Sequence, residues 1–140
     1  MQPYTIGDYA VEFDKAATAA WYEQSPGWHC ECGDCRNFLA LVGQKQLPPM
    51  VTEWLSVFGA IPEKPTYVCE LYETQQGHLY QFHYRIAGHM LNDPHPNDSV
   101  RFDWGSVYCG HDCYPYGAPN FPEPHFDLMF FMDLPWILNQ

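Results

Sequence analysis

In the second half of the chain, apolar side chains stand at every other position. Residues 80–86 alternate aromatic and aliphatic side chains with polar ones, and the same period of two recurs in residues 67–72, 100–104 and 126–134. Successive side chains of a β-strand point to opposite faces of a sheet, so this period predicts four half-buried strands. Gln76-Gly77 marks a turn between the first two of them, which predicts an antiparallel hairpin.

The alternation also predicts which side chains enter the core. The residues expected to face inward are Tyr80, Phe82, Tyr84 and Ile86. The residues expected to lie outside are Gln81, His83 and Arg85. Cys69 stands between Tyr67 and Leu71 on an apolar face, so we expect it to be a core thiol. Residues 109–124 are rich in Gly and Pro, which predicts a loop rather than a strand.

The first half of the chain combines a strand with helical segments. Residues 9–13 alternate as a strand does, and the alanine-rich residues 15–21 favour a helical turn. Asp34 is placed to cap a short helix, and Pro48-Pro49 and Gly59 bound a clearer one. We therefore expect an α+β fold, with an N-terminal strand and two short helices packed on an antiparallel sheet of about four to five strands.

Composition and charge narrow the class of protein. The chain has 140 residues, of which 46% are hydrophobic and 17% aromatic, and this fits a single domain over residues 1–140 with a packed core. Six Lys and Arg against seventeen Asp and Glu give a net charge of −11. Because that charge repels nucleic-acid phosphates and anionic lipids, we expect no nucleic acid, no membrane, and a basic protein or peptide as partner.

The sequence also carries an expectation about the compartment. Residues 1–13 alternate polar and apolar positions, unlike the basic start and apolar run of a signal peptide. The longest apolar runs fall far short of the roughly 20 residues that cross a bilayer. We expect a cytoplasmic protein, in which the six cysteines are reduced thiols or metal ligands rather than a disulfide framework. The oligomeric state is left open.

The segment His29-Cys30-Glu31-Cys32-Gly33-Asp34-Cys35 concentrates metal-binding side chains. Two thiolates spaced as in Cys32-x2-Cys35 can reach one tetrahedral Zn²⁺ ion from a tight turn. We therefore predict a Zn²⁺ site with three ligands from this segment and one from the loop at residues 109–113. The predicted ligands are Cys30, Cys32, Cys35 and Cys109. The alternatives for the last ligand are His29, His111 and Cys113.

Two other interpretations of the same cysteines stay open. They can be free thiols, with Cys35 packing in the helix, and this interpretation is as well supported as the metal site. They can also form a redox pair, because a helix N-terminus lowers the pKa of a nearby thiol. The redox interpretation ranks lowest, since the helix begins around the second cysteine and no βαβ pattern surrounds it. None of the seven histidines lies in a recognisable catalytic motif.

Cys32-Gly33-Asp34-Cys35-Arg36-Asn37-Phe38 forms a C-x2-C-x-N-F motif, and the helix at residues 51–59 is followed by Ile61-Pro62-Glu63-Lys64-Pro65. With these features the chain resembles a family of uncharacterised small bacterial proteins found mainly in Gram-positive gut bacteria. The similarity continues through Tyr84-x3-Gly88 and the closing Leu134-Pro135-Trp136-Ile137-Leu138. The resemblance implies a small cytoplasmic domain in which Cys32 and Cys35 recur, and it implies no established activity.

Three functions stay open on the sequence alone. The first is a non-enzymatic protein-interaction module, with or without a structural zinc site, whose acidic surface binds a basic protein; a toxin-neutralising immunity-type protein is one form of it. The second is a thiol-redox or metal-dependent enzyme that uses the Cys30–Cys35 cluster. The third is a structural subunit that forms a dimer through its aromatic surface. We favour the first, so enzymatic activity is the less expected alternative.

Overall fold

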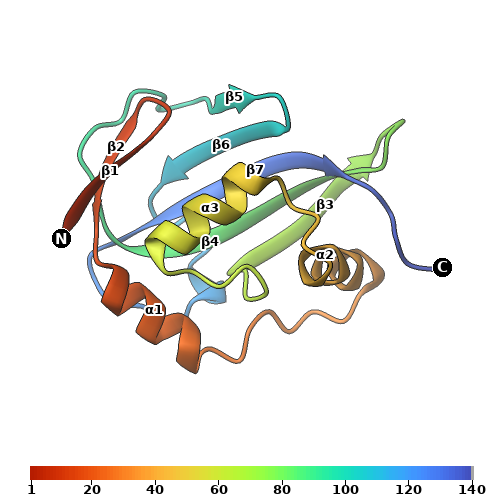
Figure 1. The fold of residues 1–140 in the computed structure, drawn as a ribbon, viewed down its shortest axis with the longest axis horizontal. Coiled ribbons are helices and arrows are strands. Elements are labelled where there is room, and N and C mark those ends of the chain that lie inside the picture. Colours follow the sequence, from red (N-terminus) through yellow and green to blue (C-terminus); the bar gives the residue numbers. More distant parts are fainter. Residues whose placement is uncertain (140) are drawn as a thin grey trace.

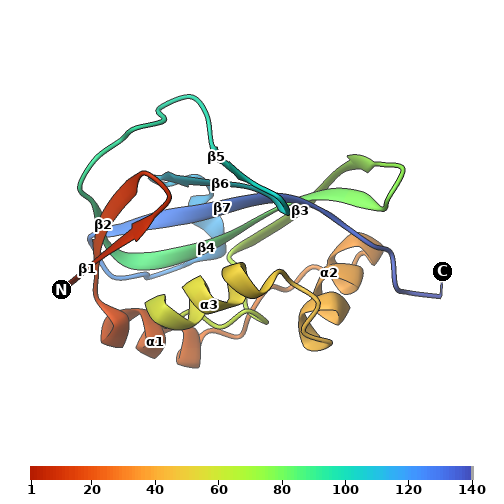
Figure 2. The ribbon, with the colours of Figure 1, turned by 45° about the horizontal axis from the view of Figure 1, so that its top comes forward.

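The computed structural model describes residues 1–139 and has an α+β architecture (Figure 1). Three α-helices cover one face of an antiparallel sheet of seven strands, with the core between these two layers (Figure 2). The strands are β1 (Gln2–Ile6), β2 (Tyr9–Phe13), β3 (Tyr67–Glu73), β4 (His78–Met90), β5 (Val100–Phe102), β6 (Gly105–Gly110) and β7 (His125–Leu134). The helices are α1 (Lys15–Gln24), α2 (Gly33–Gly43), α3 (Pro49–Phe58) and the short 3₁₀ helix η1 (Pro115–Gly117).

The α+β class and the antiparallel sheet are confirmed, whereas the number of elements differs from the expectation. The N-terminal strand is a hairpin of β1 and β2, which turns at Gly7 with a left-handed φ of 55°. The alanine-rich segment extends into the full helix α1. The strand expected at residues 100–104 ends at Phe102, and β6 follows it as the second strand of a hairpin. None of the helices in residues 1–139 has the length and apolar character needed to span a membrane.

The long strand β4 is the centre of the sheet. The strand order is β1-β2-β4-β7-β6-β5, and β3 also pairs with β4. One edge of β4 pairs with β7 from His78 to Ala87. The opposite edge pairs with β3 over residues 78–83 and with β2 over residues 88–90. Within residues 1–139, residues 84–87 therefore have no strand partner on that edge.

Side chains of α1 take the place of the missing strand. The Tyr22 hydroxyl accepts a hydrogen bond from the Arg85 N–H and donates one to the Arg85 carbonyl, both at 2.9 Å. The Thr18 hydroxyl accepts from the Ala87 N–H at 3.0 Å. Because a buried backbone group without a partner costs about 1–3 kcal/mol, these contacts tie α1 to the sheet. Complete burial raises the pKa of Tyr22, so its hydroxyl keeps its proton.

The helix α3 packs its apolar stripe on the sheet as the sequence predicts. Its buried residues are Val51, Trp54, Leu55 and Phe58. The Phe58 ring lies 4.8 Å from that of Phe13 in β2 and 6.2 Å from that of Phe126 in β7, measured between centroids. The helix ends at Gly59, whose φ of 89° is the left-handed C-cap expected there.

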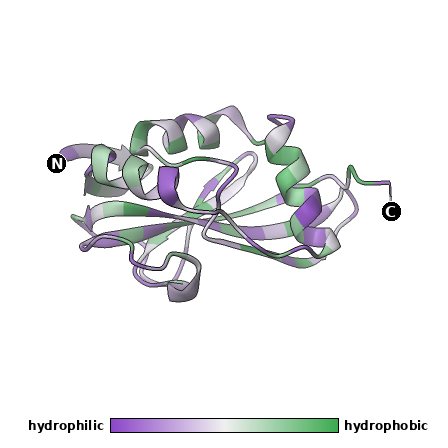
Figure 3. Ribbon diagram, turned by 90° about the horizontal axis from the view of Figure 1, so that it is seen from below, coloured by the Kyte–Doolittle hydropathy of each residue, from purple (hydrophilic) through white to green (hydrophobic). Residues whose placement is uncertain are grey.

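Residues 111–124 with η1 cover part of the second face of the sheet (Figure 3). His83 and Arg85 lie on this face, as expected, but they are only 1% and 3% exposed. Arg85 binds Asp127 through Nε–Oδ1 and Nη2–Oδ2 hydrogen bonds of 2.8 and 3.0 Å, and the Cys113 N–H donates to the same Oδ2 at 2.9 Å. The expectation that these side chains lie outside is wrong, because a loop distant in sequence buries them.

In β3 the face that packs against the helices is not the face that carries Cys69. Val68 pairs with Phe82 and is buried under the helices, whereas Cys69 lies half-buried on the opposite face. The prediction that Cys69 is a core thiol is therefore wrong. After Glu70 the pairing register shifts at a β-bulge, which changes the direction of the side chains beyond it.

Candidate metal centre

The N-terminus of α2 gathers three of the six cysteines. The segment between α1 and α2 has no regular secondary structure and enters the helix at Cys32, the N-cap residue. The Cys32 Sγ accepts a hydrogen bond from the Cys35 N–H at 3.4 Å. Asp34, the expected cap, lies in the first helical turn instead, where its negative charge interacts favourably with the helix dipole. A candidate ligand therefore caps the helix.

The sulfur atoms of Cys30, Cys32 and Cys35 converge. All three Sγ atoms lie within 4.8 Å of one another, and those of Cys30 and Cys32 are 3.2 Å apart. Zn–S bonds of about 2.3 Å place the sulfurs of a tetrahedral site about 3.8 Å apart. The three sulfurs are thus close enough to form a group that could hold one metal ion, as the sequence predicts for these residues.

The three thiols differ in their surroundings. Cys30 and Cys32 are exposed, whereas Cys35 is buried. A hydrogen bond from the Cys32 backbone N–H lowers the pKa of Cys30, and the side chains of Cys32 and Cys35 act in the same direction. Burial raises the pKa of Cys35 to about 12. Without a metal ion, Cys30 is thus the thiol prepared to ionise, while Cys35 keeps its proton until a cation displaces it.

Trp28 holds the segment that precedes the cysteines against the sheet. Its indole Nε1–H donates to the Cys35 Sγ at 3.2 Å. Its ring lies 5.8 Å from that of Tyr67 in β3 and 6.1 Å from that of Tyr114. Tyr114 belongs to the Gly- and Pro-rich residues 109–124, so this part of the chain approaches the cysteine segment.

The sulfur atoms of Cys109 and Cys113 lie apart from the three-thiol group. Cys109 pairs with Leu128 in the sheet and is fully buried, which raises its pKa. Cys113 is half-buried near Asp127, and burial raises its pKa to about 11. In residues 1–139, neither Sγ lies within 4.8 Å of all three sulfurs at α2. The structure therefore does not bring together the predicted fourth ligand, Cys109, or its alternative, Cys113, with the other three.

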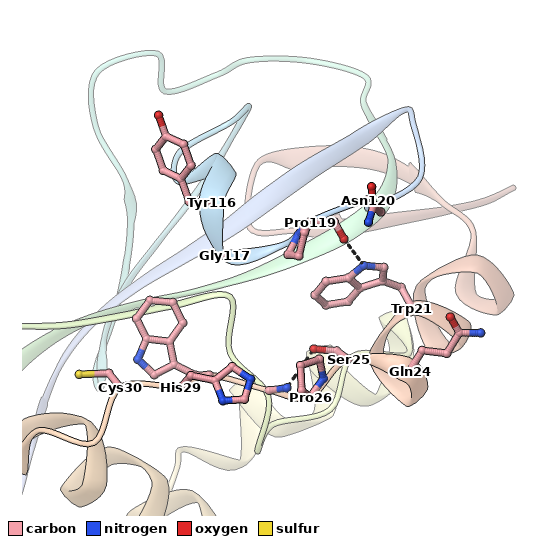
Figure 4. A pocket seen from close by; sticks show the side chains of 12 residues that line it. Trp21, Gln24, Ser25, Pro26, His29, Cys30, Tyr116, Gly117, Pro119 and Asn120 are labelled. Carbon is pink, nitrogen blue, oxygen red and sulfur yellow. Dashed lines mark hydrogen bonds between the residues drawn. The ribbon is translucent and has the colours of Figure 1, made fainter.

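The two histidine alternatives also stay apart from the group. His29 precedes Cys30, but its ring and the Cys30 sulfur point in opposite directions (Figure 4). His111 is exposed in its loop. Across the described residues, neither histidine joins the three thiols at ligand distance. The described part of the chain thus brings together three thiols that could hold a metal ion.

Hollows on either side of Cys30 give access to the cluster. The larger, a cleft of about 640 Å³, lies between the segment after α1 and the loop around η1 (Figure 4). Aromatic side chains line it, among them Trp21 and Trp28. The Trp21 Nε1–H donates a hydrogen bond of 3.0 Å to the Pro119 carbonyl across the cleft. A second hollow has Arg36 in its wall. A small molecule or a partner side chain can therefore reach the cluster.

A second group of potential ligands was missed by the sequence analysis. One ligand atom from each of Asp34, Glu70 and His78 lies within 4.8 Å of the others. Glu70 and His78 flank the predicted hairpin turn, so the register of that hairpin could have placed them near each other. The approach of Asp34 depends on how α2 docks on the sheet, for which the sequence holds no signal.

In comparisons with protein-family models, curated proteins and solved structures, nothing matches this chain. The family resemblance drawn from the C-x2-C-x-N-F motif stays a prediction. The case for a function therefore rests on the geometry of the side chains, which identifies Cys30, Cys32 and Cys35 as a group that could hold a metal ion.

Proposed function

We propose that this protein binds Zn²⁺ through Cys30, Cys32 and Cys35 and keeps the fourth coordination position for a donor supplied by a partner or a small molecule. The observation that carries the proposal is the convergence of the three Sγ atoms within 4.8 Å at the N-terminus of α2. Sulfur-rich tetrahedral sites favour Zn²⁺ among the common divalent ions.

The surroundings suit an ion held by thiolates. Three thiolates and Zn²⁺ carry a net charge of −1, and negative charge is stabilised near a helix N-terminus. The Cys35 N–H and the Trp28 Nε1–H each donate to a ligand sulfur, at 3.4 and 3.2 Å. Hydrogen bonds of this kind orient the ligands of a metal and tune the site.

An accessible three-thiol site differs from a closed structural site. A structural zinc site surrounds the ion with four protein ligands, whereas two of the three ligands here are exposed. We infer that the ion serves recognition, with the fourth donor coming from outside the group. The net charge of −11 favours a basic protein or peptide as the partner, which makes the chain a protein-interaction module.

Metal content and affinity test the site directly. Protein purified without chelators should contain about one Zn²⁺ per chain, measured by elemental analysis. Cys30→Ser, Cys32→Ser and Cys35→Ser should each weaken Zn²⁺ binding at least about tenfold in a competition titration with a chromogenic chelator, a loss of about 1.4 kcal/mol. Cys69→Ser, which changes a half-buried thiol outside the group, is the matched control and should bind as the wild type does.

Two results would exclude the zinc site. One is purified protein that neither contains nor takes up Zn²⁺. The other is a set of three serine variants whose affinities equal that of Cys69→Ser, because the three sulfurs would then contribute nothing to the binding.

A thiol-redox function is the second candidate, favoured by the 3.2 Å separation of the Cys30 and Cys32 sulfurs and the lowered pKa of Cys30. In this reaction the Cys30 thiolate attacks a substrate disulfide, forms a mixed disulfide and releases the first substrate thiolate. Cys32 then attacks the Cys30 sulfur, which forms the Cys30–Cys32 disulfide and releases the second substrate thiolate. The two cysteines lose two electrons and two protons, and the substrate gains them as two thiols. Incubation of metal-free protein with oxidised glutathione tests it. A Cys30–Cys32 disulfide with release of reduced glutathione supports the redox function, and stable thiols with Zn²⁺ binding intact reject it.

A further inference from the structure

We propose that Asp34, Glu70 and His78 form a second cation site, which takes a divalent ion that prefers oxygen and nitrogen ligands, such as Mn²⁺. The three side chains come from α2, β3 and β4, and one ligand atom of each lies within 4.8 Å of the other two. None of them belongs to the thiol cluster, so this site does not depend on the proposed zinc function.

The β3–β4 hairpin places two of the ligands on one face. Glu70 lies opposite Tyr80 in the antiparallel register, and His78 precedes Tyr80 by two residues, so all three side chains point toward the helices. The bulge that follows Glu70 shifts the register near the end of the hairpin. His78 Nδ1 and Glu70 Oε2 end 3.6 Å apart.

The third ligand is brought in by α2. The Tyr80 hydroxyl donates a hydrogen bond to the Asp34 carbonyl at 2.7 Å and fixes the first turn of the helix above the hairpin. Asp34 occupies that turn, while Cys32 and Cys35 on either side of it in sequence belong to the thiol cluster. The carboxylate of Asp34 thereby approaches Glu70 and His78.

The imidazole of His78 has an unused atom in this group. In the described part of the chain, its Nδ1 is buried and has no hydrogen-bond partner. The 3.6 Å to Glu70 Oε2 exceeds the 2.7–3.2 Å typical of an N–H···O hydrogen bond, so an ordinary imidazole–carboxylate bond does not account for the arrangement. A cation between the two atoms would satisfy both of them.

The C-terminal segment covers the site. The ring of Trp136 lies 5.0 Å from that of His78. This segment is held by the buried Asn37 of α2, which accepts from the Ile137 N–H at 2.8 Å and donates to the Pro135 carbonyl at 3.0 Å. The side chains of Glu70 and His78 are each 19% exposed as a result, so an ion there would be partly shielded from water.

The ligand types separate the two sites. Two carboxylates neutralise a divalent cation, and carboxylate with imidazole suits Mn²⁺ as well as Zn²⁺, whereas thiolates select softer ions. An ion bound to Asp34, Glu70 and His78 would also join α2 to the β3–β4 hairpin. It should therefore raise the melting temperature of the protein, because it binds the folded chain and not the unfolded one.

Mn²⁺ binding to the Cys30→Ser/Cys32→Ser protein tests the site without the thiol cluster. Both cysteines are exposed, and serine is a good N-cap at position 32, so this background should fold. We expect saturable binding by electron paramagnetic resonance, weakened at least about tenfold by Asp34→Asn, Glu70→Gln or His78→Gln. Mn²⁺ should raise the melting temperature of the background protein and not that of these variants.

His89 and Glu12 offer a matched control, since His89 Nε2 and Glu12 Oε1 lie 3.2 Å apart but join no third ligand in the described residues. His89→Gln should leave Mn²⁺ binding unchanged. Circular dichroism without metal identifies any variant that fails to fold, and Asp34→Asn, a change of nearly equal size at a half-buried position, is the substitution least expected to do so. No saturable binding to the background protein, or equal binding by the Asp34→Asn and His89→Gln variants, would overturn the second site.

Discussion

Two cysteine-bearing segments that look similar in sequence behave differently in the fold. Residues 29–35 and residues 109–113 both combine cysteine, histidine and aspartate. In the first segment the chain turns into a helix, and three Sγ atoms come together. In the second, Cys109 belongs to a strand and is buried in the core, while Cys113 lies beyond the strand near Asp127. A helix N-terminus gathers neighbouring side chains, whereas a strand and the loop after it separate them.

The buried contacts of residues 109–113 favour a role in stability, whereas binding through residues 29–35 is our proposal. Asp127 is only 1% exposed and accepts hydrogen bonds from the Cys113 N–H and from the Arg85 guanidinium, so it anchors the second segment. Asp127→Ala should lower the free energy of unfolding by about 3–5 kcal/mol, because it leaves the buried Arg85 charge without its partner. Urea denaturation measures this loss. A decrease below about 1 kcal/mol would show that the pair is dispensable.

Serine substitutions at Cys109 and Cys32 should separate the two roles. Cys109→Ser buries a hydroxyl without a partner and should destabilise the fold by about 1–3 kcal/mol, with Zn²⁺ affinity unchanged. Cys32→Ser should leave the stability of the fold nearly unchanged and weaken Zn²⁺ binding, because serine caps a helix well but is a poor zinc ligand. Chemical denaturation and chelator competition on both variants provide the comparison. Loss of Zn²⁺ binding in Cys109→Ser would restore Cys109 as the fourth ligand.

Lowering the pH should weaken Zn²⁺ binding. Burial raises the pKa of Cys35 to about 12, so this thiol is protonated at neutral pH and must release its proton to bind the ion. The apparent affinity should therefore fall at least about tenfold for each unit by which the pH is lowered, since one proton is released per ion bound. Competition titrations at several pH values measure the slope. A flat profile would mean that Cys35 is not a ligand.

The smallest effect is expected at Asp112, in the same loop as Cys113. Its Oδ1 lies 3.8 Å from Arg85 Nη2, but the side chain is 68% exposed, so water screens the pair. Asp112→Asn should change the free energy of unfolding by less than about 1 kcal/mol. The same urea titration as for Asp127→Ala tests it. A larger loss would indicate that the loop as a whole, rather than Asp127, holds the second segment.

Patterns within single elements were predictable from the sequence. Period two identified β4 and β7 with their inward faces, and helical spacing between Pro48-Pro49 and Gly59 identified α3. The three-cysteine cluster was predictable as well, because residues so close along the chain stay close in any turn. The prediction that Asp34 is the N-cap was wrong, because the N-cap is Cys32, two residues earlier. The basic partner and the cytoplasmic location stay predictions.

Contacts between distant segments required the tertiary structure. Alternation determined that His83 and Arg85 share a face, but only the packing of residues 111–124 decided that this face is buried. The sequence by itself thus determined the α+β class, the main strands and the thiol cluster, all of which depend on the intrinsic periods of helix and strand. The tertiary structure alone decided that Cys109 lies apart from that cluster and that Asp34 meets Glu70 and His78. The reason is that such distances depend on strand register and helix docking, which local spacing does not encode.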